Sequence, residues 1–234
     1  MHPEAVFLFD IDGTLIRKAG DHHRQALVDS VLDVTGLHSS LDGIATQGML
    51  DGDIVRRMLR NCGLDDASIE EKIPRVFQRA QEIYRCPALQ EKVCPGVVEL
   101  LNELRRREIP MGLVTGNLSA IAWRKMESAG LRQYFRFGAF AEMADTRAGL
   151  VGLALAQARE LKLPGQKIQV AHCGDHPNDV EAAKLNGIRS IAVATGISSF
   201  EELSDCSPDI LLNDMCSFDL TAIFENDSFS VTAG

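Results

Sequence analysis

The sequence predicts an α/β fold, a doubly wound parallel sheet with an inserted helical segment. Short apolar runs without a helical period, the first at residues 6–9, end in small polar or acidic residues. Strands buried on both faces read as such continuous apolar runs. These runs alternate with amphipathic helical patterns, and strand–helix–strand connections of this length favour parallel pairing with right-handed crossovers. Residues 17–92 interrupt the alternation with helical patterns alone, which predicts the insertion.

The remaining elements follow from the same two periodicities. Apolar runs predict further strands, and apolar residues three and four apart, closed by glycine or opened by proline, predict helices. We expect strands at 109–114, 135–140, 167–171 and 188–194, and helices at 21–36, 51–61, 65–84, 95–107, 118–130, 144–161 and 179–185. Pro74 should split the third helix into a short and a longer piece, because proline cannot donate a helical hydrogen bond. We expect a last apolar pair of turns around residues 210–212, and residues 226–234 should be frayed.

The domain division follows from the change in composition at residues 17 and 92. A doubly wound sheet needs only one helix after each strand, so a longer run of helices predicts a separate small bundle. We therefore expect a core domain of residues 1–16 and 93–234 and a helical cap domain of residues 17–92. The cap should lie over the strand ends, where open parallel sheets bind their ligands.

The first strand ends in two carboxylates and a glycine, Asp10, Asp12 and Gly13. Side chains two apart along a strand point the same way, so both carboxylates can reach one ligand. An ordinary Asp-Gly turn is the alternative interpretation. The strand end nevertheless predicts a concentration of negative charge at the sheet edge.

Polar residues follow other predicted strands at the same edge. They are Thr115, Gly116 and Asn117 after the second strand, Arg147 at a helix start, and Asp175 with Asp179 later in the chain. Each of these signals is weak alone. Because the carboxyl ends of parallel strands meet at one edge, their order along the chain predicts that they converge on a single site.

Composition restricts the partners. A net charge of -9 disfavours nucleic-acid binding, which requires clustered lysine and arginine. No apolar run approaches the roughly 20 residues of a membrane-spanning helix, so we expect no membrane partner. The six cysteines lack paired short spacings, and no basic-then-apolar leader is evident, so we expect reduced thiols and a cytoplasmic location. Nothing in the sequence indicates an oligomeric state.

The run Asp10-Ile11-Asp12-Gly13-Thr14 resembles the first motif of the haloacid dehalogenase-like hydrolases, mostly phosphatases. The later sites stand in the order of the other motifs of that family, and the helical insertion is similar to the cap of its phosphoglycolate phosphatase-like members. The resemblance implies a phosphatase that hydrolyses a small organic phosphate monoester. Asp10 would attack phosphorus to form an aspartyl phosphate, and Asp12 would protonate the leaving alkoxide. That task requires a raised pKa at Asp12, which burial under the cap would supply.

The same resemblance implies a magnesium site, since two adjacent anions need a cation. Asp10, the backbone carbonyl of Asp12, and Asp175 offer the oxygen ligands that magnesium prefers. The phosphoryl oxygens would receive hydrogen bonds from the Thr115 hydroxyl and from the backbone of Gly116 and Asn117.

Arg147 stands where this family usually has a lysine. We assign the role to Arg147 because it begins a helix at the ligand edge, whereas Lys162 and Lys167 flank the start of a strand at the opposite edge. Asp179 would orient Arg147 or support the metal, or act as a simple N-cap. In the cap, Gln47 is a candidate for substrate contact.

Several alternatives stay open from the sequence. A phosphomutase shares the core residues, and a non-catalytic binding protein could retain the fold. A dehalogenase is disfavoured because Asp12 would have no task there, and a phosphonate-cleaving enzyme would need a lysine in the cap loop. We interpret His22 and His23 as a solvated helix start.

Overall fold

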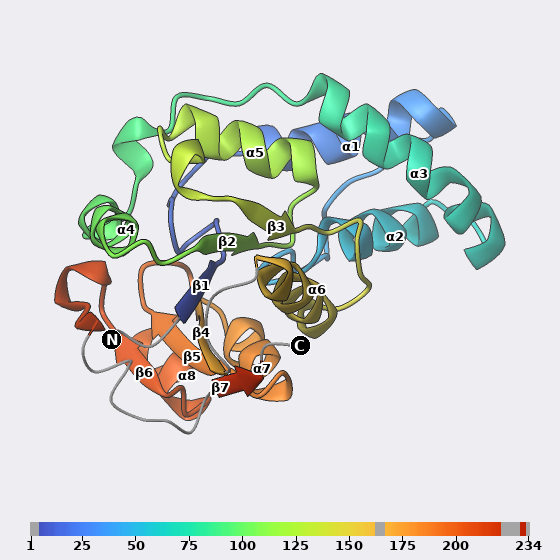
Figure 1. The fold of residues 1–234 in the computed structure, drawn as a ribbon. Coiled ribbons are helices and arrows are strands. Elements are labelled where there is room, and N and C mark those ends of the chain that lie inside the picture. Colours follow the sequence, from blue (N-terminus) through green and yellow to red (C-terminus); the bar gives the residue numbers. More distant parts are fainter. Residues whose placement is uncertain (1–4, 162–166, 221–229, 233–234) are drawn as a thin grey trace.

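The computed structural model describes residues 5–161, 167–220 and 230–232. A sheet forms its centre, with strands in the order β3-β2-β1-β4-β5-β6, and every neighbouring pair along this path is parallel. The strands are β1 (Ala5–Phe9), β2 (Met111–Val114), β3 (Phe137–Ala139), β4 (Lys167–Gly174), β5 (Arg189–Val193), β6 (Ile210–Leu212) and β7 (Ser230–Thr232). The predicted doubly wound α/β sheet is therefore confirmed (Figure 1).

Helices cover both faces of the sheet because alternate residues of β1 point to opposite sides. Phe7 and Phe9 belong to one buried cluster with residues of α4 and α5, while Val6 and Leu8 belong to another with residues of α6 and α7. The helices of the core are α4 (Val97–Arg106), α5 (Ser119–Ser128), α6 (Arg147–Glu160), α7 (Pro177–Leu185) and α8 (Phe200–Asp205). Apolar contacts on both faces explain why β1 is buried along its whole length.

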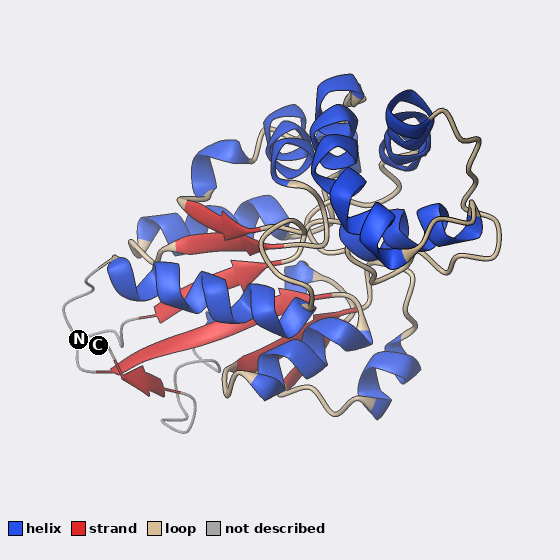
Figure 2. Cartoon of the chain, turned by 90° about the vertical axis from the view of Figure 1, so that its right-hand side faces the viewer, coloured by secondary structure: helices blue, strands red, loops and turns tan. Residues whose placement is uncertain are grey.

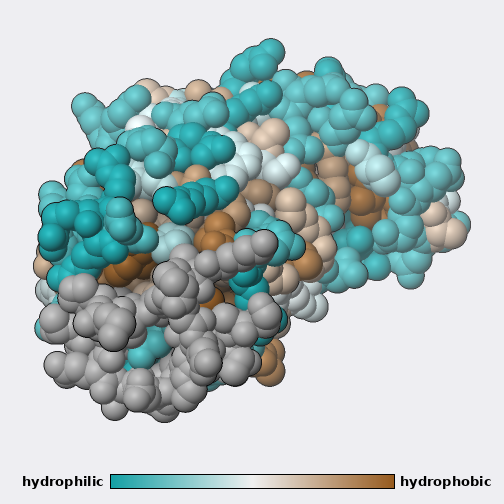
Figure 3. All heavy atoms as spheres, viewed as in Figure 1, coloured by the Kyte–Doolittle hydropathy of each residue, from teal (hydrophilic) through white to brown (hydrophobic). Residues whose placement is uncertain are grey.

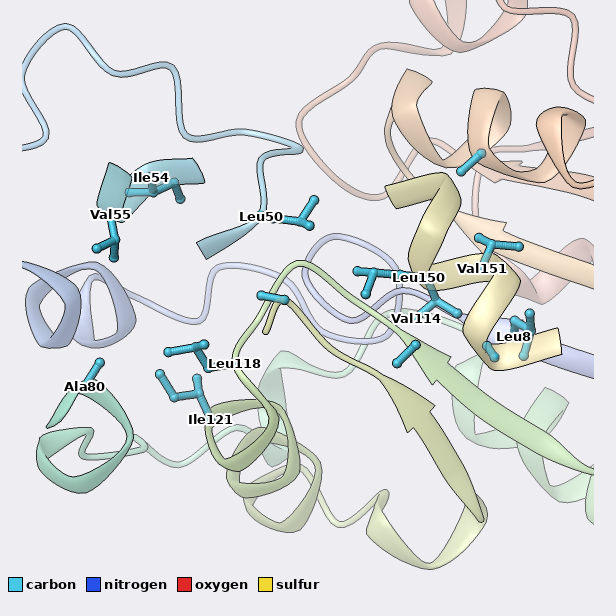
Figure 4. Packing of buried hydrophobic residues seen from close by; sticks show 14 of the residues in the cluster. Leu8, Leu50, Ile54, Val55, Ala80, Val114, Leu118, Ile121, Leu150 and Val151 are labelled. Carbon is cyan, nitrogen blue, oxygen red and sulfur yellow. The ribbon is translucent and has the colours of Figure 1, made fainter. Parts of the chain in front are cut away.

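The segment between β1 and α4, which we call the helical segment (residues 17–92), contains three α-helices. They are α1 (His22–Thr35), α2 (Asp51–Asn61) and α3 (Asp66–Ile83). The parallel strands point toward the side of the molecule where these helices lie (Figure 2). Buried residues of the helical segment, such as Leu50, Ile54 and Val55, are continuous with the core residues Leu118 and Ile121 (Figure 4). The helical segment is thus packed against the core through apolar side chains.

The chain enters and leaves the helical segment through two hydrogen-bonded passages. Ile16 forms an antiparallel bridge with Val93, the Arg17 N–H donates to the Lys92 carbonyl (2.9 Å), and the Cys94 N–H donates to the Leu15 carbonyl (2.9 Å). The division into core and cap domains at residues 17 and 92 stays a prediction, and this pair of passages is where the boundary would lie.

Three details of the predicted elements were wrong. α3 is continuous through Pro74, which lies on the exposed face of the helix. Burial of the apolar residues on the opposite face offsets the missing hydrogen bond; they are Ile69, Ile73, Val76 and Ala80. Residues 210–212 form β6 and not a turn. Of the segment expected to be frayed, residues 230–232 form β7, which pairs antiparallel with the start of β4. Residues 226–229 and 233–234, like Lys162, lie outside the described residues.

Hydrophilic side chains dominate the surface in the space-filling view, with apolar patches between them (Figure 3). Among the described residues, none of the helices has the length and apolar character needed to cross a bilayer.

Candidate active site

Three carboxylates from two strand ends and one helix meet at the edge of the sheet. Asp10 follows β1, Asp175 follows β4, and Asp179 lies in the first turn of α7. The register explains the meeting, since Phe9 lies opposite both Leu113 of β2 and Cys173 of β4. Carboxylate oxygens of Asp10, Asp175 and Asp179 all lie within 4.8 Å of one another, and all three residues are buried. The predicted convergence of Asp10 and Asp175 is therefore present in the structure.

Arg147 is the cation that faces this cluster. It is the first residue of α6, whose start is fixed by Thr146, the side chain of which accepts a hydrogen bond from the Gly149 N–H (3.0 Å). Its Nη1 donates to Asp10 Oδ1 (2.9 Å) and lies 3.1 Å from Asp179 Oδ1. The Nε of Arg147 is buried without a hydrogen-bond partner among the described residues. The Nε–H of Arg147 is thus left for a further acceptor.

Asp179 both contacts Arg147 and caps a helix. Its Oδ2 accepts from the His176 N–H (3.2 Å), and His176 in turn is the N-cap of α7, so the two form a reciprocal capping box. The simple N-cap interpretation of Asp179 is corrected, because Asp179 is the third residue of the helix. The sharp turn between β4 and α7 is what brings this residue back to the cluster.

The electrostatics of the cluster leave it short of positive charge. Burial, opposed by Arg147 and reinforced by Asp179 and Asp12, raises the pKa of Asp10 to about 6. Burial, together with Asp10 and Asp179, raises the pKa of Asp175 to about 8. Burial also acts to raise the pKa of Asp179, but Arg147 and His172 outweigh it and lower that pKa. Three buried carboxylates facing one guanidinium are a donor set that fits a hard divalent cation such as Mg²⁺.

Gly13 and Thr14 hold the Asp175 carboxylate in place. The Thr14 hydroxyl, fully buried, donates to Asp175 Oδ1 (3.0 Å). Gly13 has φ +94°, and a Cβ on it would overlap the Asp175 carboxylate. The glycine of the first motif is therefore required both for the backbone turn and for the approach of Asp175.

Asp12 lies in a different environment from the one expected. Its Oδ2 accepts hydrogen bonds from Lys125 Nζ (2.6 Å) and Asn117 Nδ2 (2.8 Å), and its side chain is 41% exposed. Desolvation acts to raise the pKa of Asp12, but the positive Lys125 and the hydrogen bonds from Lys125 and Asn117 outweigh it, so the pKa is lowered. The expected raised pKa is thus wrong for the protein in this state, because a cation is in direct contact.

Lys125 is the site residue that sequence analysis missed. It lies on α5, and its side chain is only 2% exposed. The signal was present in the sequence: Lys125 stands among Ile121, Ala122 and Met126 on the buried face of the helix that follows Thr115. A lysine on such a face needs acceptors, and the nearby strand end supplies them. His23 was also misjudged, since it is 16% exposed and bonded to Asp51 and Lys125, not solvated.

The second strand end carries the remaining predicted residues. The Thr115 hydroxyl is buried and accepts from the backbone N–H (3.3 Å) and the side chain (2.8 Å) of Asn117. The Gly116 carbonyl accepts from the Asp51 N–H (2.8 Å), which joins this loop to the helical segment. The Asn117 N–H is thus already engaged and is not the free phosphate donor expected, because the tight turn directs it onto Thr115.

The loop containing Gln47 lies against α7 of the core. The Gly48 carbonyl accepts from Asn178 Nδ2 (3.0 Å), and a Cβ on Gly48 would overlap the His176 ring. Gln47 itself is exposed. Its predicted contact with substrate stays a prediction.

Comparisons with known proteins agree with this geometry. The model of the haloacid dehalogenase-like hydrolase family matches residues 5–187. The chain is 28% identical over 211 residues to phosphoglycolate phosphatase 1 of Pseudomonas aeruginosa, covering 89% of this chain and 76% of that protein. It is also 28% identical over 211 residues to a phosphoglycolate phosphatase of Synechococcus elongatus, covering 88% and 91% of the two chains.

Solved structures share the fold. A β-phosphoglucomutase from Clostridium difficile superposes with a TM-score of 0.66 at 17% identity, covering 94% of this chain and 95% of that one. A predicted phosphoglycolate phosphatase from Haemophilus somnus gives a TM-score of 0.65 at 16% identity, covering 91% and 95%. Because the family match spans most of the chain and includes β1, β2 and β4, this chain belongs to the haloacid dehalogenase-like hydrolases.

Proposed function

We propose that this protein is a magnesium-dependent phosphatase that hydrolyses a small organic phosphate monoester through an aspartyl-phosphate intermediate. The observation that carries the proposal is the pair formed by Asp10 and Arg147 beside a cluster of buried carboxylates. A carboxylate held by a guanidinium that retains an unpartnered N–H is suited to attack a phosphoryl group whose oxygens that N–H can bind.

The first chemical step belongs to Asp10. Arg147 holds Oδ1, which leaves Oδ2 to form a bond to phosphorus while the ester P–O bond breaks. Asp12, in the protonated form that its contact with Lys125 disfavours, gives its proton to the departing alkoxide. The equatorial oxygens of the phosphoryl group would be bound by Arg147 and by the Thr115 hydroxyl, with the Gly116 backbone beside them.

The second step releases phosphate. Asp12 removes a proton from a water molecule, the water oxygen bonds to phosphorus, and the bond between phosphorus and Asp10 breaks. Each proton and each leaving group is accounted for by these two carboxylates, so the chain ends the cycle as it began.

Asp10, the backbone carbonyl of Asp12, and Asp175 would hold the magnesium ion, with Asp179 supporting the site through Arg147. Bound magnesium neutralises the carboxylates and draws negative charge from the phosphoryl oxygens. We keep a cytoplasmic location as part of the proposal, because all six cysteines are free thiols.

The position of the helical segment is an argument for a small substrate. The helical segment contacts the loop after β2 through the Asp51–Gly116 hydrogen bond and the start of α7 through the Asn178–Gly48 hydrogen bond, and we infer that it leaves room over Asp10 only for a small ester. Relatives named phosphoglycolate phosphatase make phosphoglycolate the first substrate to test.

The test is a screen of the purified protein against small phosphate monoesters, phosphoglycolate and hexose phosphates included, with magnesium and with a chelator. We expect phosphate release that depends on magnesium, and we expect Asp10→Asn to reduce it to background while thermal unfolding shows a folded protein. Full activity of Asp10→Asn, or full activity in chelator, would contradict the proposal. Isomerised sugar phosphate without phosphate release would assign a phosphomutase instead.

A further inference from the structure

Lys125 is a buried cation in which every N–H has an acceptor. Its Nζ lies 2.6 Å from Asp12 Oδ2, 2.6 Å from Asn117 Oδ1 and 3.3 Å from His23 Nδ1. An ammonium group has three hydrogens and no acceptor, so these contacts satisfy it completely. The acceptors come from the first strand end, the second strand end and the helical segment. Lys125 therefore joins three parts of the chain at a single atom.

The contacts of Lys125 determine the state of His23. Since the ammonium can only donate, His23 Nδ1 must be the acceptor, and the ring proton must lie on Nε2, which donates to Asp51 Oδ2 (2.8 Å). Asp51 Oδ2 also accepts from the Leu118 N–H (2.8 Å) at the start of α5. His23 and Asp51 belong to the helical segment, whereas Lys125 and Leu118 belong to the core. The arrangement of Lys125 is thus completed only when the two parts are packed together.

The two oxygens of Asp12 are in unequal environments. Oδ2 is held by both Lys125 and Asn117, while no described residue donates to Oδ1. The Asp12 side chain is 41% exposed, although the Lys125 side chain that holds it is 2% exposed. One oxygen is therefore fixed from within the protein, and the other is left to exchange a proton with a substrate.

We propose that Lys125 is a positioning residue for Asp12. His23 and Asp51 complete the hydrogen bonds of Lys125, so that Asp12 is aligned for proton transfer when the helical segment covers the site. This inference rests on the proposed phosphatase function. If Lys125 only satisfied buried acceptors, its loss would lower activity by the same factor for every substrate. A cation that aligns the acid matters most for substrates whose leaving group needs a proton.

The leaving-group dependence of kcat/KM tests this proposal. This constant reports the steps up to phosphorylation of Asp10, so water attack does not obscure it. For Lys125→Met, we expect kcat/KM to fall about 10²-fold with an alkyl phosphate, which is the lower end of the loss expected when general-acid catalysis is removed. With 2,4-dinitrophenyl phosphate the fall should be far smaller, because this leaving group needs no proton. Lys72→Met, on α3 outside this network, should leave both unchanged.

The contribution of the helical segment is tested with His23→Phe, which keeps a ring but removes the Nδ1 acceptor and the Nε2 donor. We expect a loss in the same direction and smaller than that of Lys125→Met, while the neighbouring His22→Phe, at an exposed position, should behave as the unmodified protein. This variant also provides the test if Lys125→Met does not fold.

The outcomes separate the two proposals. If the unmodified protein hydrolyses no phosphate ester, the proposed function fails. If it does, but Lys125→Met and His23→Phe lower kcat/KM by the same factor for both leaving groups, the positioning role is overturned and Lys125 is structural only. A loss confined to the alkyl phosphate supports the role.

Discussion

Gly13 allows the first strand end to approach Asp175 closely. The backbone at Gly13 adopts φ +94°, a conformation that other residues rarely adopt, and its missing Cβ leaves the space that the Asp175 carboxylate occupies. Gly63, after α2, has a similar φ of +87° but no atom within 4 Å of an added Cβ. The two glycines thus separate the effect of backbone strain from that of crowding.

Replacement of Gly13 by alanine is expected to displace Asp175. Both Gly13→Ala and Gly63→Ala should lose roughly 1–2 kcal/mol of stability from the left-handed conformation. Only Gly13→Ala should weaken magnesium binding and abolish phosphate release, because only there does a methyl group meet a carboxylate of the cluster. Isothermal titration with magnesium and an activity assay measure the difference. Equal behaviour of the two variants would mean that Asp175 is not positioned by this glycine.

At this same scale, the sequence predicted which residues meet but not how each is paired. Asp10, Asp175 and Arg147 follow from strand ends at one edge, which is a consequence of parallel topology. The pairing of Asp12 with Lys125 depends on the rotation of α5 about its axis and on the side-chain direction of a long residue. The local apolar pattern indicates which face of α5 is buried, but not which acceptor the long side chain of Lys125 reaches, so the expected raised pKa of Asp12 was wrong.

Among the elements, α3 shows how packing overrides local preference. Pro74 lies inside a helix of 18 residues, with its own side exposed and Ile73 and Val76 buried beside it. The apolar stripe continues on both sides of the proline, so burial against α1 holds the two halves in one helix. Periodicity located the helix correctly, but a rule for single residues could not weigh that burial.

The change Pro74→Ala is expected to stabilise the protein. Alanine restores the N–H that the helix lacks at this position and removes the steric conflict with the preceding turn, an effect of up to about 3 kcal/mol. Urea unfolding followed by circular dichroism measures it, and Arg75→Ala, an exposed neighbour, serves as the control. An unchanged or lowered midpoint for Pro74→Ala would show that the turn around residue 74 is shaped for proline.

For the whole molecule, the carboxylate cluster makes stability depend on pH and on metal. The folded pKa values of Asp10, about 6, and Asp175, about 8, lie above the ordinary value of 3.8. Between pH 3.8 and the folded pKa of each group, the folded chain therefore binds more protons than the unfolded chain. The stability of the metal-free protein should fall as pH rises through this window, which ends at about pH 8. His176, whose pKa burial lowers from 6.5, acts in the opposite sense below that value.

Urea unfolding in chelator is expected to give a lower midpoint at about pH 8 than at about pH 6.5, the upper part of this window. Magnesium at 100 times its dissociation constant should add about 2.7 kcal/mol of stability. Asp175→Asn should flatten the pH dependence, because it removes the larger of the two shifts. A metal-free protein that becomes steadily more stable toward alkaline pH would contradict the assigned charges.

The overall topology was the most predictable level. Alternation of apolar strands and amphipathic helices specifies a parallel sheet, and an excess of helices after the first strand specifies an insertion. The short strand β6 and the antiparallel β7 were missed because a strand of three residues carries too little periodicity to be told from a turn.

The antiparallel bridge between Ile16 and Val93 has a consequence for protein engineering. Because the segment entering the insertion and the segment leaving it are already hydrogen-bonded to each other, their separation is fixed by the backbone and not by the helices beyond. A different module with closely spaced ends can be grafted at this junction without altering the sheet. Exchange of the insert would change which compounds are admitted, but a new insert would have to keep counterparts of His23 and Asp51, because these residues complete the contacts of Lys125 with Asp12.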